Sequence, residues 1–237
     1  MNRIALMVMR NLSIVPGAWF KLCKYAKNTD DYSYEEKYAH IRYILKRGVQ
    51  GGNINLHVYG EENVPDGAAL LYSNHQGLFD VVAAVAACEK PISAVFKKEI
   101  ENIPFIKQIA ICLKGLAMDR NDARQSLGVI QTVTEEVMKG RKYLIYPEGT
   151  RSKLGNQMID FHAGSFRCAV KAKCPIVPIA VIDTYKVFDT KDSKPVDCQL
   201  HFLAPIQPEE FEGMKAGEVA DLVKARIQEA LDQYAEV

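Results

Sequence analysis

The sequence predicts an α/β fold, in which a central and largely parallel β-sheet is flanked by helices. From residue 54 onwards, short apolar segments typical of strands alternate with longer segments of helical periodicity, as they do in β-α-β units. The composition is that of an ordinary globular protein, with 48% apolar and 25% charged residues. A chain of 237 residues can therefore form a large core without metal or disulfide cross-links.

Seven strand-like segments recur along the chain. The first, at residues 54–59, alternates between apolar and polar side chains, and a turn at Pro65, Asp66 and Gly67 follows it. The later strands are expected at residues 69–73, 93–96, 115–118, 143–146, 176–182 and 199–203.

Helical segments lie between these strands. Ser33 and Glu36 have the spacing of a capping box, which begins a helix that Gly48 is expected to end. Proline at position 104 is expected to break or begin the helix at 99–113. The other helices are expected at residues 79–88, 122–139, 165–173 and 216–234.

The first 29 residues differ from the rest in charge, because they carry basic residues and no acidic one. Lys21, Lys24 and Lys27 recur every three residues and share one face of a helix. Pro16 and Gly17 are expected to divide the segment into two short helices. Neither helix approaches the ~20 apolar residues that a membrane span requires. The basic residues of this segment are Arg3, Arg10, Lys21, Lys24 and Lys27.

This pattern predicts an amphipathic helical element at residues 1–50 that contacts an anionic phospholipid surface, followed by an α/β domain at 51–237. The alternative is a pair of helices that pack on the protein's own core. A secretory signal fits poorly, because the apolar run at residues 4–9 is short and no small-residue cleavage site follows it. We therefore expect a peripheral or monotopic protein on the cytoplasmic face of a membrane, without a spanning helix.

Charge and cysteine spacing argue against two other classes of protein. The net charge of +1 gives no reason to expect nucleic-acid binding. The six cysteines include no C-x-x-C pair, so they fit buried thiols in a reducing compartment better than a zinc site.

A histidine and an acid lie five residues apart, just after the strand predicted at 69–73. Histidine is suited to proton transfer near neutral pH, and a carboxylate can fix its tautomer. On one ideal helix five residues correspond to about 140° of rotation, so the two side chains would diverge. They meet if His75 leaves the strand, Gly77 allows a tight turn and Asp80 enters the first turn of the next helix.

Cations follow three of the other predicted strands, and ligands gather at strand ends in such sheets. Lys97, Arg120 and Arg151 each stand at such an end, where they would suit an anionic headgroup. A solvated loop charge is the alternative for each one taken alone. Glu148 is expected either to bond a substrate hydroxyl or to brace its loop through backbone N–H groups.

Four motifs now stand in order along the chain. Asn74, His75 and Asp80 form N-H-x4-D, and Gly115 and Arg120 form a Gly-x4-Arg pattern. Tyr-Pro-Glu-Gly-Thr-Arg-Ser occupies 146–152, and Val-Pro-Ile-Ala occupies 177–180. With these motifs the chain resembles the glycerolipid acyltransferases of the lysophosphatidic acid acyltransferase type, over roughly residues 60 to 185.

The resemblance implies transfer of a fatty acyl group from acyl-CoA or acyl carrier protein to the free hydroxyl of lysophosphatidic acid, giving phosphatidic acid in phospholipid biosynthesis. His75 would be the general base and Asp80 would orient it. The thioester is a co-substrate, and neither a metal nor a prosthetic group is expected. The residues expected to bind substrate are Lys97, Arg120, Glu148, Gly149, Thr150 and Arg151.

The chain departs from the family's pattern at Gly77, where many relatives have serine, at His162, where lysine is frequent, and at Leu116 and Ala117, where bulkier apolar residues are common. Other functions stay open. The acceptor could be another lysolipid or glycerol 3-phosphate, and Ser73 could act as a nucleophile in a double displacement. The chain could also be a non-catalytic membrane lipid-binding module, or a metal-dependent hydrolase that uses His75, Asp80 and His162.

Overall fold

The computed structural model describes residues 2–190 and 192–235. Within them lies a seven-stranded sheet with the order β1-β7-β6-β2-β5-β3-β4. All neighbouring strands run parallel except β6 and β7, which are antiparallel. The predicted α/β fold with a largely parallel sheet is therefore confirmed.

The strands follow the predicted segments closely. They are β1 (Ile54–Tyr59), β2 (Ala69–Ser73), β3 (Ser93–Lys97), β4 (Leu116–Met118), β5 (Lys142–Ile145), β6 (Ile176–Ile182) and β7 (Val196–Phe202). Every residue of β6 is buried, which explains its continuous apolar sequence. The strand predicted at 199–203 begins earlier, at Val196, because β7 pairs with β1 from Val196 opposite Ile54.

The helices differ from prediction mainly at their ends. They are α1 (Arg3–Met9), α2 (Val15–Lys27), α3 (Tyr34–Gly51), α4 (Phe79–Ala87), α5 (Ile106–Cys112), α6 (Ala123–Met138), α7 (Arg167–Ala172), α8 (Lys186–Asp189) and α9 (Ala216–Tyr234). The short helix α8 was not predicted. Ser33 caps α3 by accepting the N–H of Glu36, as the capping box indicated. Gly48 does not end α3, since one interior glycine costs a helix only about 1 kcal/mol.

The break near Pro16 also lies elsewhere than predicted. Pro16 stands in the first turn of α2, and the chain leaves helical geometry before it, between α1 and α2. A proline is tolerated there because the first turn of a helix has no partner for the missing N–H. The segment still forms the two short helices that were expected.

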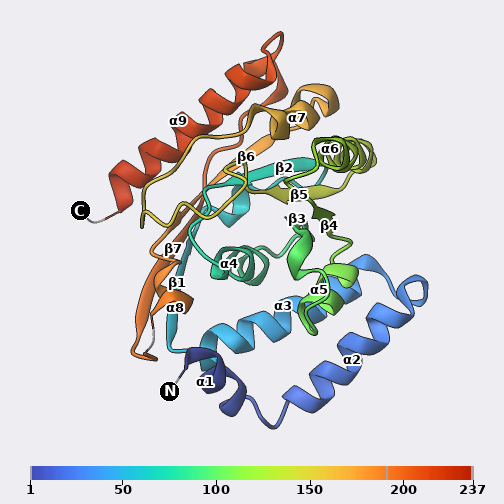
Figure 1. The fold of residues 1–237 in the computed structure, drawn as a ribbon, viewed down its shortest axis with the longest axis vertical. Coiled ribbons are helices and arrows are strands. Elements are labelled where there is room, and N and C mark those ends of the chain that lie inside the picture. The colour runs from blue at the N-terminus through green and yellow to red at the C-terminus, as the bar shows by residue number, and fades with distance from the viewer. Residues whose placement is uncertain (1, 191, 236–237) are drawn as a thin grey trace.

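Helices cover both faces of the sheet (Figure 1). α6, α7 and α9 pack on one face around a core that includes Val133, Phe166 and Val223. α3, α4 and α5 pack on the other face, where Ile41 and Phe79 belong to a second core. All six cysteines are free thiols, and five of them are buried.

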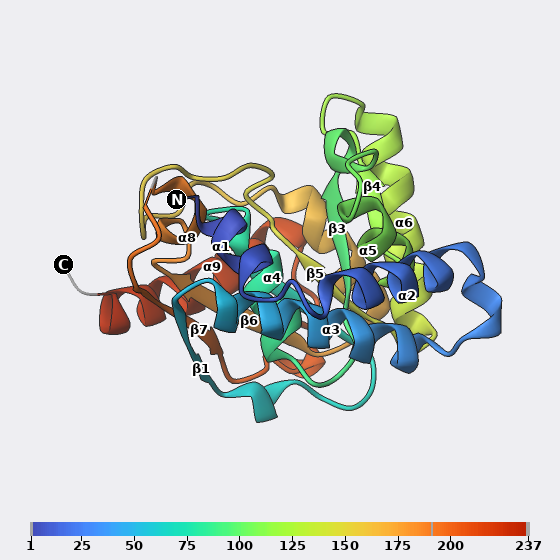
Figure 2. The same ribbon diagram turned by 90° about the horizontal axis from the view of Figure 1, so that it is seen from below.

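The N-terminal helices form an outer layer over α3 (Figure 2). Leu22 and Tyr25 of α2 are buried in the same core as Ile41 of α3. Arg3 is 1% exposed, and its guanidinium donates to the carbonyl oxygens of Val187 at 2.7 Å and Gly52 at 2.8 Å. Arg3 is therefore a structural residue and not one of the surface cations. The boundary expected at residue 50 stays a prediction.

The parallel arrangement brings the carboxyl ends of β2, β5, β3 and β4 side by side at one edge of the sheet. The four polar strand ends singled out in the sequence belong to these four strands. They lie within three strand spacings, or about 14 Å, of one another.

Candidate active site

The residues after β2 fold as the His-x4-Asp spacing requires. His75 leaves the strand, and Asp80 lies in the first turn of α4. The Nδ1 atom of His75 is 2.7 Å from Oδ2 of Asp80. Asp80 is fully buried, whereas 16% of the His75 side chain is exposed. The structure therefore places a partly accessible imidazole on a buried carboxylate.

The carboxylate of Asp80 is held by backbone and side-chain donors. Oδ2 also accepts the N–H groups of Gln76 at 2.7 Å and Gly77 at 3.0 Å. Oδ1 accepts the hydroxyl of Thr184 at 2.6 Å. The Asp80 carboxylate thus accepts four hydrogen bonds at the N-terminus of α4.

An ionised carboxylate can only accept hydrogen bonds, so Nδ1 of His75 carries the proton that Asp80 Oδ2 accepts. In the neutral imidazole, Nε2 is then the nitrogen with a free lone pair. This atom makes no hydrogen bond with any residue that the structure describes. The arrangement is that of a general base whose tautomer is fixed by an acid.

The ring of Tyr146 stacks on His75, with 4.3 Å between ring centroids and 28° between the ring planes. Tyr146 is buried, and its hydroxyl has no hydrogen-bond partner among residues 2–190 and 192–235. Burial raises the pKa of this phenol well above its ordinary value. Tyr146 was recognised in the sequence only as part of a motif, because spacing does not show which ring faces which.

Glu148 braces the loop that follows β5. Its Oε1 accepts the N–H of His75 at 2.7 Å, and its Oε2 accepts the N–H of Ile159 at 3.1 Å. The loop is further joined to the site by the N–H of Ser152, which donates to the carbonyl of His75 at 2.9 Å. Burial raises the pKa of Glu148. These contacts favour the bracing role, and a direct bond to substrate stays a prediction.

Gly149 and Thr150 have different local roles in the same loop. Gly149 has a φ of +68°, and a Cβ there would lie 2.8 Å from Cδ2 of His162. Only glycine fits both demands without strain. Thr150 is exposed, so its hydroxyl is open to a ligand.

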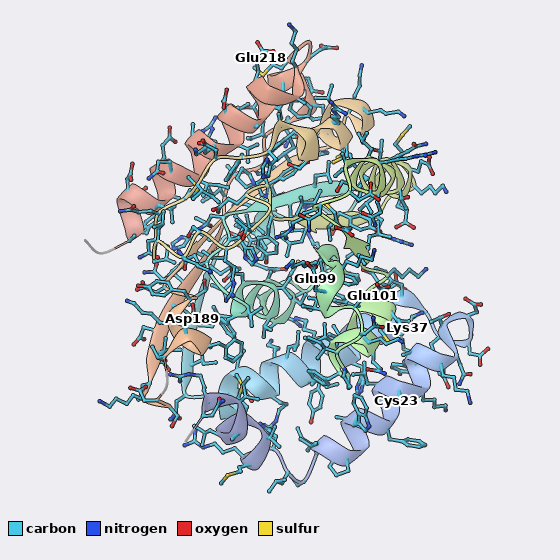
Figure 3. The ribbon with its side chains drawn as sticks, viewed as in Figure 1. Cys23, Lys37, Glu99, Glu101, Asp189 and Glu218 are labelled. Atoms are coloured by element: carbon cyan, nitrogen blue, oxygen red, sulfur yellow. The ribbon has the colours of Figure 1, made fainter. Side chains whose placement is uncertain are left out.

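The three candidate cations lie nearer to solvent. Arg151 is 3.7 Å from the carboxylate of Asp189, and Lys97 is 2.7 Å from that of Glu99. Figure 3 shows Asp189 and Glu99 on opposite flanks of α4. Arg120 is exposed at the end of β4. The structure therefore brings the cations to the same sheet edge as His75, each on its own strand end.

Two of the alternative chemistries find no support in this geometry. Ser73 is 1% exposed, and its hydroxyl donates to the carbonyl of Asn74 at 2.9 Å, so it does not face an incoming carbonyl. In the part of the chain that the structure describes, no three side chains of histidine, cysteine or acid gather as metal ligands. His162 is exposed beside Gly149 and is not joined to the His75 pair.

A family model for the Acyltransferase family matches residues 55–182, more than half of the chain. This chain belongs to the Acyltransferase family. The match extends from β1 to the end of β6 and includes every site residue that was predicted from the sequence. The membership that the four motifs indicated is thus confirmed.

Curated relatives in this family carry the name 1-acyl-sn-glycerol-3-phosphate acyltransferase. The one from Pseudomonas aeruginosa is 36% identical over 137 residues, which are 57% of this chain and 52% of the relative. The one from Escherichia coli is 35% identical over 119 residues, which are 50% of this chain and 48% of the relative. This chain spans about half the length of the curated relatives that it matches.

A solved structure shares the acyltransferase fold. It is the 1-acyl-sn-glycerophosphate (LPA) acyltransferase from Thermotoga maritima, with a TM-score of 0.76 and 20% sequence identity. The similarity covers 98% of this chain and 97% of that one, so it includes the N-terminal helices. At this identity the likeness shows a common fold.

Proposed function

We propose that this protein transfers a fatty acyl group from a thioester donor to the free hydroxyl of lysophosphatidic acid, giving phosphatidic acid. The observation that carries the proposal is the His75 imidazole, whose Nδ1 is fixed by buried Asp80 and whose Nε2 has no hydrogen-bond partner in the described part of the chain. The relatives act, by their name, on 1-acyl-sn-glycerol-3-phosphate, which supports lysophosphatidic acid as the acceptor.

In the proposed reaction, Nε2 of His75 removes the proton of the acceptor hydroxyl while its oxygen attacks the thioester carbonyl. The tetrahedral intermediate collapses, the carbon–sulfur bond breaks, and the thiolate leaves. Thiols are far more acidic than alcohols, so this departure needs little assistance, and the imidazolium can return its proton to the sulfur. Asp80 stabilises the imidazolium while it exists. No acyl-enzyme forms, consistent with the inaccessible hydroxyl of Ser73.

The phosphate of the acceptor is proposed to bind Arg151 first, because β5 is the neighbour of β2 in the sheet. An arginine fork can bind two phosphate oxygens, and the phosphate would displace the exposed carboxylate of Asp189. Lys97 and Arg120 stand further along the edge, where they would add positive charge. Thr150 offers an exposed hydroxyl in the same region.

The donor is proposed to be acyl-CoA or acyl carrier protein, because both supply the thioester that this chemistry needs. The reaction as written requires no metal and no prosthetic group.

We further propose that α1 and α2 lie on a membrane surface at the cytoplasmic face. No helix in the described part of the chain is both long and apolar enough to cross a bilayer. The two helices expose large apolar side chains beside the exposed cations Lys21, Lys24 and Lys27. The exposed large apolar residues of α1, α2 and the turn between them are Ile4, Val8, Met9, Leu12, Val15, Trp19 and Phe20.

The apolar face extends beyond the N-terminal helices to the segment before α5. The ring of Phe105 lies 6.4 Å from that of Trp19, and Ile103 nearby is also exposed. This segment follows β3, whose last residue is Lys97. A surface that lies on α2 would thus reach the carboxyl edge of the sheet, where a lipid acceptor must arrive.

The decisive assay is the release of free thiol from acyl-CoA and from acyl carrier protein, with and without lysophosphatidic acid. Thiol release that requires the acceptor, resists a chelator and forms phosphatidic acid supports the proposal. Release without any acceptor, stopped by a chelator, would instead identify a metal-dependent hydrolase. A panel with glycerol 3-phosphate and other lysolipids identifies the acceptor. Lipid binding without thiol release would identify the protein as a non-catalytic lipid-binding module.

Membrane contact is tested by surface substitutions, because deleting the first 28 residues would also remove buried Arg3, Leu22 and Tyr25. Leu12→Ser and Phe20→Ser together should reduce flotation with anionic vesicles while the melting temperature stays unchanged. Met138→Ser on α6 is the matched control, since Met138 is 64% exposed on another side of the molecule. Equal flotation of the double variant and the wild type would place the membrane contact elsewhere.

A further inference from the structure

Thr184 joins the candidate site from a distant part of the chain. It follows β6, is fully buried, and places its hydroxyl 2.6 Å from Oδ1 of Asp80. We propose that Thr184 is a positioning residue that fixes the carboxylate of Asp80 and, through it, the imidazole of His75. This inference rests on the proposed function and extends it to a residue outside the four motifs.

The hydroxyl of Thr184 has one hydrogen and two acceptors within reach. Oγ1 is 2.6 Å from Asp80 and 2.9 Å from Oε1 of Gln76. Oε1 of Gln76 already accepts the backbone N–H of Thr184 at 3.0 Å. The amide orientation of Gln76 is set by Nε2, which donates to Val181 and Asn156. An anion is the stronger acceptor and lies closer, so the hydroxyl hydrogen belongs to Asp80.

Thr184 donates the side-chain hydrogen bond that holds Oδ1, the second carboxylate oxygen of Asp80. Oδ2 of Asp80 accepts from His75, Gln76 and Gly77, all in the preceding loop. The side-chain donor to Oδ1 comes from Thr184. A carboxylate bound at both oxygens cannot rotate about its Cβ–Cγ bond. Without this hydroxyl, Oδ1 would be buried without its donor, and rotation toward other donors would move Oδ2 away from the imidazole.

The chain makes room for this contact at Gly77. A Cβ at Gly77 would lie 3.1 Å from Cα of Tyr185 and 3.6 Å from the carbonyl oxygen of Thr184. The turn before Thr184 is fixed by Asp183, whose φ is +61° and whose N–H donates to Asn156 at 2.9 Å. The missing side chain of Gly77 thus permits the approach of the segment after β6.

The same segment is held from its other side by the N-terminal helix. Arg3 of α1 donates from Nε to the carbonyl of Val187 in α8, at 2.7 Å. Thr184 therefore lies between two fixed points, the turn at Asp183 and the carbonyl of Val187. A positioning residue needs this rigidity, because even a small displacement of the base from its correct place lowers the rate.

The test compares Thr184→Val, which keeps the shape and removes the hydroxyl, with Thr184→Ser, which keeps the hydroxyl. We expect Thr184→Val to lower kcat for acyl transfer about tenfold or more, part of the ~10²–10⁴-fold that a general base contributes. KM for both substrates should change little, and Thr184→Ser should restore most of kcat. Thr134→Val is the matched control, because Thr134 is also buried and its hydroxyl donates to the carbonyl of Ile130 within α6. An unchanged kcat in Thr184→Val, with or without a rise in KM, would overturn the proposal.

A double-mutant cycle separates positioning from a general structural role. If Thr184 acts through Asp80, Thr184→Val should cause no further loss of kcat in an Asp80→Asn background. Losses that multiply in the double variant would show that Thr184 does not act through Asp80. Should Thr184→Val fail to fold, Thr184→Ala also removes the hydroxyl and should give the same selective loss of kcat relative to Thr184→Ser.

A second readout keeps this inference apart from the proposed function. The ring ¹⁵N signals of His75, assigned with His75→Gln, report the Nδ1 hydrogen bond without any substrate. Thr184→Val should shift them, whereas Thr184→Ser and Thr134→Val should not. If the wild type transfers no acyl group, the proposed function fails while the ¹⁵N signals still decide the role of Thr184. Unchanged His75 signals in Thr184→Val would overturn the positioning role.

Discussion

The two halves of the carboxyl edge are built in different ways. At the ends of β2 and β5, Asp80 and Glu148 are buried, and each uses both carboxylate oxygens as acceptors. At the ends of β3 and β4, Lys97 and Arg120 stand in solvent. Within residues 2–190 and 192–235, Lys97 is held only by a surface ion pair with Glu99.

The difference corresponds to what each half is proposed to do. A general base must already have its correct orientation when the substrate arrives, and buried hydrogen bonds fix that orientation. Exposed ion pairs contribute little to stability, so a phosphate can replace a carboxylate partner at little cost. Substitutions in the first half should therefore change the rate, and substitutions in the second half should change affinity.

The largest effect is expected from His75→Ala. Removal of the base should lower kcat by about 10²–10⁴-fold, the usual contribution of general-base catalysis. Folding should persist, because the imidazole is partly exposed and its ring lies at the end of the strand. Steady-state thiol release and a melting curve measure the two quantities. Activity within tenfold of the wild type would remove His75 from the chemistry.

Glu148→Gln tests whether the buried bracing matters. The amide keeps one acceptor oxygen but turns an NH₂ group toward a backbone N–H, of either His75 or Ile159. A buried donor without an acceptor costs about 1–3 kcal/mol, so the free energy of unfolding should fall by that amount and kcat should fall with it. Glu99→Gln, at an exposed site, is the control and should leave stability unchanged.

The pH dependence of this stability loss has a defined sign. Burial raises the pKa of Glu148 above its ordinary value of 4.5, so the folded state keeps a proton that the unfolded state has released. The contribution to stability is complete below pH 4.5 and is lost as pH rises through the folded pKa. Urea unfolding at several pH values should therefore show the largest difference between wild type and Glu148→Gln below pH 4.5. A difference that grows with pH would contradict the raised pKa.

Arg151→Lys tests a cation that follows β5 like Glu148 but is partly exposed and is proposed to bind phosphate rather than to brace the base. Lysine keeps the charge but loses the planar fork, so a phosphate would lose one charge-assisted hydrogen bond. The KM for lysophosphatidic acid should rise about tenfold, with little change in kcat or in the KM for the donor. Arg226→Lys, on α9, serves as the control. Equal KM values for variant and wild type would place Arg151 outside the phosphate site.

The smallest effect is expected from Tyr146→Phe, which separates ring stacking from the hydroxyl. Phenylalanine keeps the ring on His75 and removes a buried hydroxyl that has no partner in the described chain. The rate should stay within about twofold, and the melting temperature should be unchanged or slightly higher. Tyr146→Leu should lower kcat more, since it also removes the stack. A large loss in Tyr146→Phe would mean that the hydroxyl contacts substrate.

Local patterns predicted most of the elements and the pairing of His75 with Asp80. Strand and helix periodicities depend on neighbouring residues, so they could be recognised without the fold. The same patterns misplaced the break near Pro16 and the end of α3, because helix ends depend on what packs against them. They also counted Arg3 as a surface cation, although its guanidinium donates to the carbonyls of Gly52, at the end of α3, and of Val187, in α8.

The sequence by itself predicted the fold class, the four motifs and the pairing of His75, the proposed base, with Asp80, because each depends on residue types at short spacing. The tertiary structure alone decided the strand order, which puts β5 between β2 and β3. It also decided that Tyr146 stacks on His75 and that Thr184 reaches Asp80 across 104 positions. Such contacts arise when strands are assembled into a sheet, and no local periodicity records them.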